Sequence, residues 1–151
     1  MGIPVFYADE EAKKLYLEEE VIAFFKEKYG EICFTNHHLD HSKLATFIFS
    51  NLENRKQVEA FMHPLVMQKF EKWASQQDSN IVMLESAIVF EAGLEKLFDK
   101  IITVDAPLEV RIERIKNRNT QLSEAEILQR IHSQLSQKEK CTRSDLVIWN
   151  G

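Results

Sequence analysis

Basic side chains gather in the last third of the chain, where an anionic ligand could bind. Arg111, Arg114, Lys116 and Arg118 stand close together at the end of a helical pattern. A guanidinium presents a fork of N–H donors that matches the oxygens of a phosphate or a carboxylate. The ordinary alternative is that basic residues late in a helix complement its dipole and stay solvated. The spacing favours an anion site and leaves this alternative open.

Acidic side chains follow two apolar, β-branched runs, which is the second pattern with chemical meaning. Residues 81–84 and 101–104 form these runs, which end at Glu85 and Asp105 and lead into helical patterns. Buried parallel strands of an α/β sheet have such sequences, and ligands of these sheets bind at the carboxyl ends of the strands. A strand, an aspartate, a helix started by proline and clustered arginines together indicate a kinase that handles nucleotides.

The elements that must position these residues begin with a short strand within residues 2–9. From Asp9 the pattern turns helical, and Asp9 stands where a helix N-cap would. Residues 17–78 are predicted as an all-helical block, in which residues 31–39 are a connection and Asp40 caps the helix that follows. Pro64 either starts a new helix or kinks one long helix.

The C-terminal part is predicted to hold two polar helices, over residues 123–135 and 136–143. Ser123 and Glu126 form a capping-box pattern at the start of the first. Residues 146–149 form a last apolar run, which we interpret as a strand. The predicted fold is α/β, with a parallel-sheet core formed by residues 1–16 and 79–151.

Length and composition exclude several classes of protein. A chain of 151 residues is long enough for a single domain with a hydrophobic core. The net charge of −5 argues against nucleic-acid binding, which draws its affinity from many phosphate contacts. No apolar run approaches the roughly 20 residues of a membrane span, no signal-peptide pattern opens the chain, and the two cysteines fit a reducing compartment. We therefore expect a cytoplasmic protein without nucleic-acid or membrane partners.

Five phrases of the sequence resemble dephospho-CoA kinase, in the order of that family and over nearly the whole chain. They are Gly2-Ile3-Pro4-Val5 with Ala8-Asp9, His63-Pro64-Leu65, Phe90-Glu91-Ala92-Gly93-Leu94, Val104-Asp105-Ala106-Pro107, and Glu139-Lys140 with Ser144-Asp145-Leu146-Val147-Ile148. The resemblance implies a P-loop kinase that transfers the γ-phosphate of ATP to the ribose 3′-hydroxyl of dephospho-CoA, the last step of coenzyme A synthesis. It also implies Mg²⁺, a three-layer parallel-sheet core, a substrate-binding insertion over residues 17–78 and a helical lid over about 115–143.

The resemblance assigns residues to the acceptor side of the reaction. Asp9 matches the family aspartate at a strand end, where a carboxylate can accept or orient the proton of the incoming hydroxyl. His63 belongs to the substrate-binding part, with a structural helix cap as the alternative. Phe90 and Glu91 follow the strand near residue 81, where the acceptor approaches, although Phe90 could be core. Glu85 is expected near the acceptor and could help to hold Mg²⁺ through water.

Three basic residues are assigned to ATP and to the lid by the same resemblance. Arg114 and Arg118 match arginines that precede the lid, and Lys140 matches a basic lid position, with surface solvation as the alternative. Two positions depart from the family pattern. Tyr7 stands where many members carry a second aspartate, and Cys141 stands where an arginine is common.

Three histidines, His37, His38 and His41, lie within five residues and could suggest a metal site. They fall in a connection and at a helix start with no cysteine nearby. We therefore assign no protein residue as a metal ligand.

The phosphate-binding turn of P-loop kinases, GxxxxGK[ST], does not occur in these residues. The sequence has four glycines, Gly2, Gly30, Gly93 and Gly151, and contains no Gly-Lys-Ser or Gly-Lys-Thr. The resemblance places this loop and its strand ahead of Gly2, with that strand between those near residues 81 and 101, and a further helix after Asn150. We therefore expect the chain to be inactive by itself. Its strands either rearrange to close the gap or cover it by self-association.

Two alternatives remain for the function. The first is a non-catalytic module, derived from the kinase, that binds CoA-like ligands or a protein. The second is another small-molecule kinase of the P-loop type, such as a nucleoside monophosphate kinase. The His63-Pro64-Leu65 phrase and the long helical insertion argue against the second.

Overall fold

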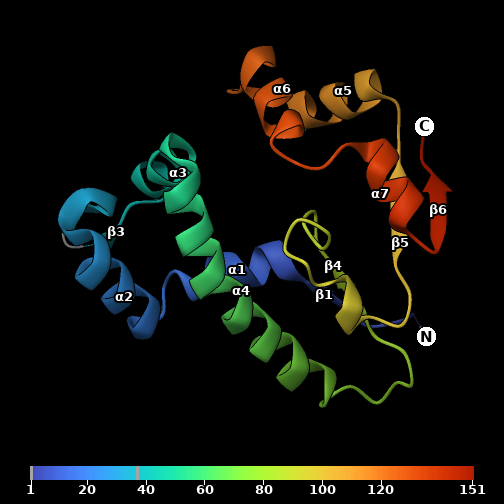
Figure 1. Ribbon diagram of the computed structural model, residues 1–151, viewed down its shortest axis with the longest axis horizontal. Coiled ribbons are helices and arrows are strands. Elements are labelled where there is room, and N and C mark those ends of the chain that lie inside the picture. Colours follow the sequence, from blue (N-terminus) through green and yellow to red (C-terminus); the bar gives the residue numbers. More distant parts are fainter. Residues whose placement is uncertain (1, 37) are drawn as a thin grey trace. The chain divides into compact units, whose positions relative to one another are not determined.

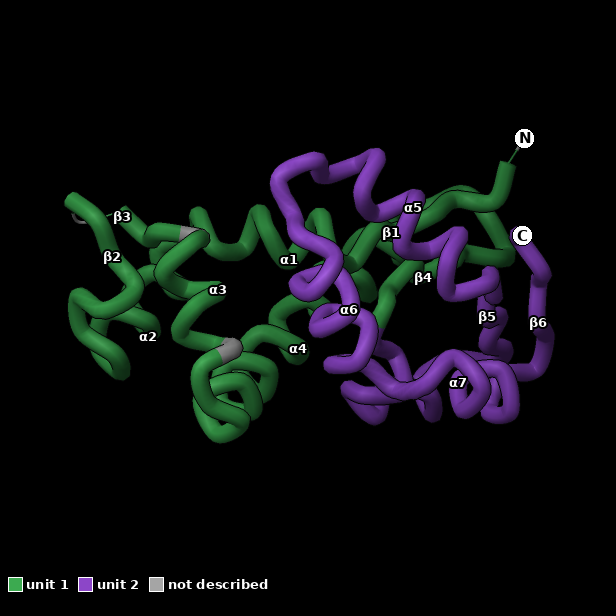
Figure 2. Tube along the Cα trace, turned by 90° about the horizontal axis from the view of Figure 1, so that it is seen from above, with its two compact units in different colours: residues 1–87 green, residues 88–151 purple. Residues whose placement is uncertain are grey.

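The computed structural model describes residues 2–36 and 38–151, except for the side chains of His41 and Phe49. The chain divides into two compact units, Met1–Ala87 and Ile88–Gly151 (Figure 2). Helices and parallel strand pairs occur in both, which confirms the predicted α/β class. The predicted partition into a core (1–16 with 79–151) and an insertion (17–78) concerns functional roles and stays a prediction.

The first unit begins and ends with strands that pair with each other in parallel, so that Tyr7 lies opposite Glu85. Because α1 already begins at Ala8, Asp9 lies inside its first turn and the N-cap position falls on Tyr7. The predicted N-cap role of Asp9 is therefore wrong. In chain order this unit contains β1 (Val5–Tyr7), α1 (Ala8–Leu15), α2 (Glu19–Tyr29), η1 (Gly30–Cys33), β2 (Phe34–Thr35), β3 (His38–Leu39), α3 (His41–Ser50), α4 (Leu52–Ala74) and β4 (Met83–Glu85) (Figure 1).

The main apolar core of the chain lies among the helices of this unit. Val21, Phe25 and Cys33 are fully buried there, and apolar side chains of α3 and α4 pack against them. The predicted cap at Asp40 is confirmed, since its carboxylate accepts the N–H groups of Ser42 and Lys43. The core therefore orders the helices between β1 and β4 by apolar burial and local capping.

The all-helical prediction for residues 17–78 is wrong at one place, where β2 and β3 pair in an antiparallel ribbon. Phe34 anchors this ribbon in the core with 3% of its surface exposed. Asn36 has a φ of 50°, a left-handed conformation that asparagine tolerates better than most residues. The ribbon is too short to show a strand period in the sequence.

Helix α4 is a single helix that contains Pro64 in its interior, which decides between the two predictions for that proline. Pro64 has no N–H to donate to the preceding turn, and packing holds the helix across this point. Near the C-terminal end of α4, the rings of Phe70 and Trp73 each lie 5.5 Å from the ring of Phe6 in β1. Aromatic packing on α4 therefore holds β1, the strand that directly precedes α1 and Asp9.

The second unit contains the other parallel pair, with Asp105 opposite Trp149. The predicted capping box of Ser123 and Glu126 is present. The predicted helix after the strand near residue 81 is wrong: residues 86–94 contain no helix, and residues 89–93 form turns that end at Gly93, whose φ is 66°. The unit contains η2 (Glu95–Leu97), β5 (Ile102–Asp105), α5 (Leu108–Arg118), α6 (Glu124–His132), α7 (Gln137–Arg143) and β6 (Leu146–Trp149).

Strands β4 and β5 each have one partner among the described residues, β1 for β4 and β6 for β5. No strand among the described residues pairs with both β4 and β5, so the predicted rearrangement of the strands is not observed there. Within the described residues, no helix has both the length and the apolar character that crossing a membrane requires.

Candidate active site

Two predicted acidic residues meet at the carboxyl ends of β1 and β4. The parallel pairing brings both strand ends to one edge, where Glu85 closes β4 and Asp9 lies two residues beyond β1. Burial raises the pKa of Glu85, and the charges of Asp9 and Glu10 raise it further. The edge therefore concentrates negative charge, which suits the orientation of a hydroxyl proton or the attraction of a cation. The effect of Glu10 on the pKa of Glu85 was not predicted, although a second acidic residue directly after Asp9 could have indicated it.

His63 lies in the interior of α4, so the predicted alternative of a cap at a helix start is wrong. Burial lowers the pKa of His63; Glu59 opposes this shift and Arg55 adds to it. Arg55 and Glu59 form an ion pair on the same helix, with 2.7 Å between Arg55 Nε and Glu59 Oε1. The imidazole is therefore held towards its neutral form, in which one ring nitrogen donates and the other accepts a hydrogen bond.

Glu91, predicted on the acceptor side, and Lys140, predicted in the lid, form an ion pair. The distance from Lys140 Nζ to Glu91 Oε1 is 2.8 Å, and the two side chains are 11% and 15% exposed. Glu91 Oε1 also accepts the backbone N–H of Leu135, at 2.9 Å. Burial opposes ionisation of Glu91, but the bonds from Lys140 and Leu135 outweigh it and lower the pKa of Glu91. A phosphate can reach the Lys140 ammonium only in competition with this carboxylate.

A second ion pair, Glu95 with Arg143, lies next to the first. The Arg143 guanidinium also lies over the ring of Phe90, 4.6 Å from its centroid, and Phe90 is 8% exposed. The sequence left open that Phe90 is a core residue, and Phe90 is buried in this structure. We call the pairs Glu91–Lys140 and Glu95–Arg143 the lid latch, because they join the turn after β4 to α7. The pairing of Glu95 with Arg143 was not predicted, since their separation of 48 positions leaves no local pattern.

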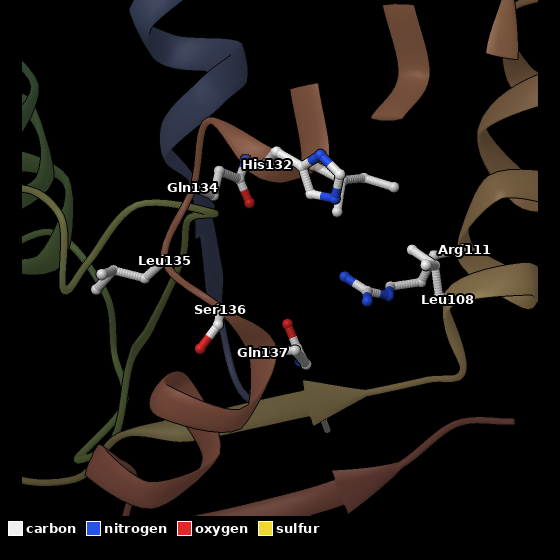
Figure 3. Close-up of a pocket in the computed structure, with 8 residues that line it drawn as sticks. Leu108, Arg111, His132, Gln134, Leu135, Ser136 and Gln137 are labelled. Carbon is white, nitrogen blue, oxygen red and sulfur yellow. The ribbon is translucent and has the colours of Figure 1, made fainter. Parts of the chain in front are cut away.

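The arginines of α5 have three different surroundings. Arg114 Nη1 donates to the carbonyl of Asn150 at 2.8 Å, and Arg118 is exposed in the last turn of the helix. Arg111 instead lines a pocket of about 300 Å³ (Figure 3). The sequence placed Arg111 in the basic cluster but gave no reason to distinguish it from the other arginines. The binding of phosphate by Arg114 and Arg118 stays a prediction.

No group of three or more His, Cys, Asp or Glu side chains gathers to hold a metal ion among the residues that the structure describes. His37 and the side chain of His41 lie outside those residues.

Comparison with known proteins decides the family. The model of the dephospho-CoA kinase family matches residues 1–151. The chain belongs to the dephospho-CoA kinase family. Among its relatives, the dephospho-CoA kinase of Bacteroides fragilis is 40% identical and that of Bacillus licheniformis 39% identical; each alignment covers 99% of this chain, with 74% and 77% of the relative.

Solved structures agree with this dephospho-CoA kinase assignment. A crystal structure of a Thermus thermophilus protein superposes with a TM-score of 0.89 at 32% identity, over 99% of this chain and 76% of that one. The dephospho-CoA kinase of Campylobacter jejuni gives a TM-score of 0.63 at 25% identity, with the same coverage. The predicted fold class, an α/β protein of the P-loop kinase type, is therefore confirmed.

Proposed function

We propose that this chain carries the acceptor and lid machinery of a dephospho-CoA kinase, which phosphorylates the ribose 3′-hydroxyl of dephospho-CoA with ATP. One observation supports this proposal above others: in a chain of this family, Asp9 stands beside Glu85 at the carboxyl ends of two paired strands. Asp9 would accept or orient the proton of the attacking hydroxyl. His63, Phe90 and Glu91 would contribute to the acceptor side.

The acidic edge at Asp9 and Glu85 fits a magnesium ion. Mg²⁺ prefers oxygen ligands and is usually held by one or two carboxylates, several waters and the phosphates of the substrate. Burial raises the pKa of Glu85 and the charges of Asp9 and Glu10 raise it further, and a bound cation would offset both effects. Mg²⁺ would neutralise charge on the phosphates of ATP, with Asp9 and Glu85 holding it directly or through water. Arg114, Arg118 and, after release from Glu91, Lys140 would bind phosphate oxygens from the lid side.

We further propose that these 151 residues transfer phosphate very slowly by themselves, since they contain no GxxxxGK[ST] turn. The test measures radiolabel transfer from ATP to dephospho-CoA by the chain and by a chimaera. The chimaera joins the Gly-rich loop segment of a dephospho-CoA kinase to residues 2–151. Fast transfer by the chain alone would disprove the requirement for that loop.

The role of Asp9 is tested in the same chimaera. Asp9→Asn should lower kcat by about 10²- to 10⁴-fold, the usual contribution of a positioned acid or base. Glu11→Gln is the matched control, because it removes a carboxylate from the same helix whose partner is Lys14. Equal rates for Asp9→Asn and the control would exclude Asp9 from the chemistry.

The alternative function is a module that binds a CoA-like ligand or a protein without transferring phosphate. The lack of the phosphate-binding turn within these residues favours it. Calorimetry with dephospho-CoA and with ATP, in separate titrations, distinguishes the two. Binding of dephospho-CoA alone, together with an inactive chimaera, would support the module.

We also propose a cytoplasmic location and self-association of the chain. Cys33 and Cys141 are free thiols, as is usual in a reducing compartment. Apolar side chains are exposed on β5, where Ile102 is 41% and Val104 56% exposed, and strand edges of this kind pair with other chains. Light scattering that gives the mass of a monomer at all concentrations would exclude self-association.

A further inference from the structure

The pocket at Arg111 lies wholly within the second unit, between the start of α5, the end of α6 and the start of α7. Its volume of about 300 Å³ is at the lower end of the range for small-molecule sites. Leu108, Ile131 and Leu135 supply apolar wall, while Arg111 and Gln137 direct polar groups into the space (Figure 3). Apolar walls with a few converging polar groups are typical of binding sites for small organic molecules.

One N–H group of Arg111, at Nε, has no acceptor among the described residues. Its Nε is buried and makes no hydrogen bond to any of them. A buried donor on a charged group is unfavourable when it has no acceptor. The residues that line the pocket include no carboxylate, and His132 adds an imidazole to the lining. The charge and the free N–H both favour an anion.

The side-chain amide of Gln137 favours an anion that carries a proton over one that carries none. Its Nε2 donates to the backbone carbonyl of Val104 at 2.8 Å, which orients the amide so that its oxygen faces the pocket (Figure 3). That oxygen can only accept a hydrogen bond. A carboxylate is ionised at neutral pH and offers no proton, whereas a phosphomonoester has a second pKa near 6 and retains a P–OH in part.

We propose that this pocket binds the phosphoryl group of a small phosphate or phosphomonoester, with Arg111 as its principal donor and the side-chain oxygen of Gln137 accepting a hydrogen bond from its P–OH group. The site shares no residue with the acidic edge at Asp9 and does not depend on phosphate transfer. The phosphoryl group comes either from free inorganic phosphate or from a nucleotide. A phosphate oxygen of the ligand would then accept the hydrogen bond from Arg111 Nε.

The test follows the side-chain Nε–H signal of Arg111 by NMR in the full chain labelled with ¹⁵N, close to pH 6, about the second pKa of phosphate. Inorganic phosphate should shift this signal saturably, and acetate should not. In Arg111→Gln, the backbone amides of Leu135 and Gln137 should lose their response, with affinity falling roughly tenfold or more. Lys138→Gln is the matched control, since it removes an exposed charge of α7 outside the pocket lining.

Each outcome bears on the proposal. A titration with ATP that shifts the same signals more tightly than phosphate supports the proposal with a nucleotide as the source. Phosphate shifts that do not saturate, or that acetate reproduces, overturn it, as does equal binding by Arg111→Gln and the control. If Arg111→Gln fails to fold, the wild-type Arg111 signal alone decides. Because no transfer is measured, failure of the proposed kinase function leaves this result interpretable.

Discussion

Replacement of Glu91 by glutamine should destabilise the second unit, because it breaks one half of the lid latch. Glu91→Gln keeps the size of the side chain and removes its charge. Lys140, whose side chain is only 11% exposed, then loses its carboxylate partner. The backbone N–H of Leu135 keeps a weaker, neutral acceptor.

The expected cost is about 1.5–3 kcal/mol, the range for hydrogen bonds to charged groups. Glu124→Gln is the matched control, since it breaks a pair of similar length to Lys116, at 2.6 Å, whose side chains are 45% and 60% exposed. Exposed pairs of this kind contribute little to stability, because water screens the two charges. The comparison isolates the effect of burial on an ion pair within one unit.

Amide exchange of Leu135 is the direct assay, because its N–H donates to Glu91. A loss of about 2 kcal/mol corresponds to roughly thirtyfold faster exchange, if exchange follows local opening. A single melting temperature is less suitable, since a chain with two compact units need not unfold in one step. A double-mutant cycle with Lys140→Met then gives the coupling between the two side chains.

The pH dependence provides an independent check. Since the folded state holds the pKa of Glu91 below its ordinary value, the stabilisation is present above the ordinary pKa and is lost as the pH falls through the lowered one. Wild type and Glu91→Gln should therefore converge in acid. Equal exchange of Leu135 in Glu91→Gln and Glu124→Gln at neutral pH would refute the argument from burial.

Three further predictions concern other sites. Glu85→Gln should stabilise β4, measured as slower exchange of its amides near neutral pH, because a raised pKa makes the ionised carboxylate unfavourable in the folded state. The effect should be smaller below the ordinary carboxyl pKa of about 4.3, and a benefit confined to acid would contradict this sign. Phe25→Ala should cost about 3–5 kcal/mol in urea unfolding, since Phe25 is 0% exposed, whereas Ile32→Ala, at a residue 59% exposed, should cost well under 1. Ser123→Ala should cost about 1 kcal/mol through the capping box, measured as faster exchange of the Ile127 amide; unchanged exchange would show that packing alone holds α6.

The parts of the fold with local signals were predictable from the sequence. Asp40 and Ser123 cap helices as expected, because an N-cap depends only on the residue and the few N–H groups after it. Apolar runs located β5 and β6 because both strands follow polar segments. Two predictions were wrong where the local sequence allows more than one structure. The first is the N-cap at Asp9, because α1 already begins at Ala8. The second is the helix over residues 86–94, whose apolar side chains are spaced as on a helix face but lie in a segment without a helix.

The candidate site was predictable only as separate pieces. Asp9, Glu85, Glu91 and Lys140 could be assigned roles by resemblance, but no pattern in the sequence predicts that Glu91 and Lys140 bind each other across 49 positions. The same holds for Arg111, whose difference from Arg114 depends on which side of α5 faces the end of α6. Long-range pairing of charges depends on tertiary packing, which periodicity does not record.

The pairing of β1 with β4 also bears on the order of folding. Val5 and Met83 are partners although they lie 78 positions apart, and closing so long a loop carries an entropic cost that only later contacts offset. The helices between the two strands bury Phe25 and Val21 through closer contacts and can form first. During synthesis β1 can therefore pair with β4 only after the helices between them have been made. Pulse-labelled hydrogen exchange should show amides of α2 protected before those of β1 and β4, and the reverse order would exclude this sequence of events.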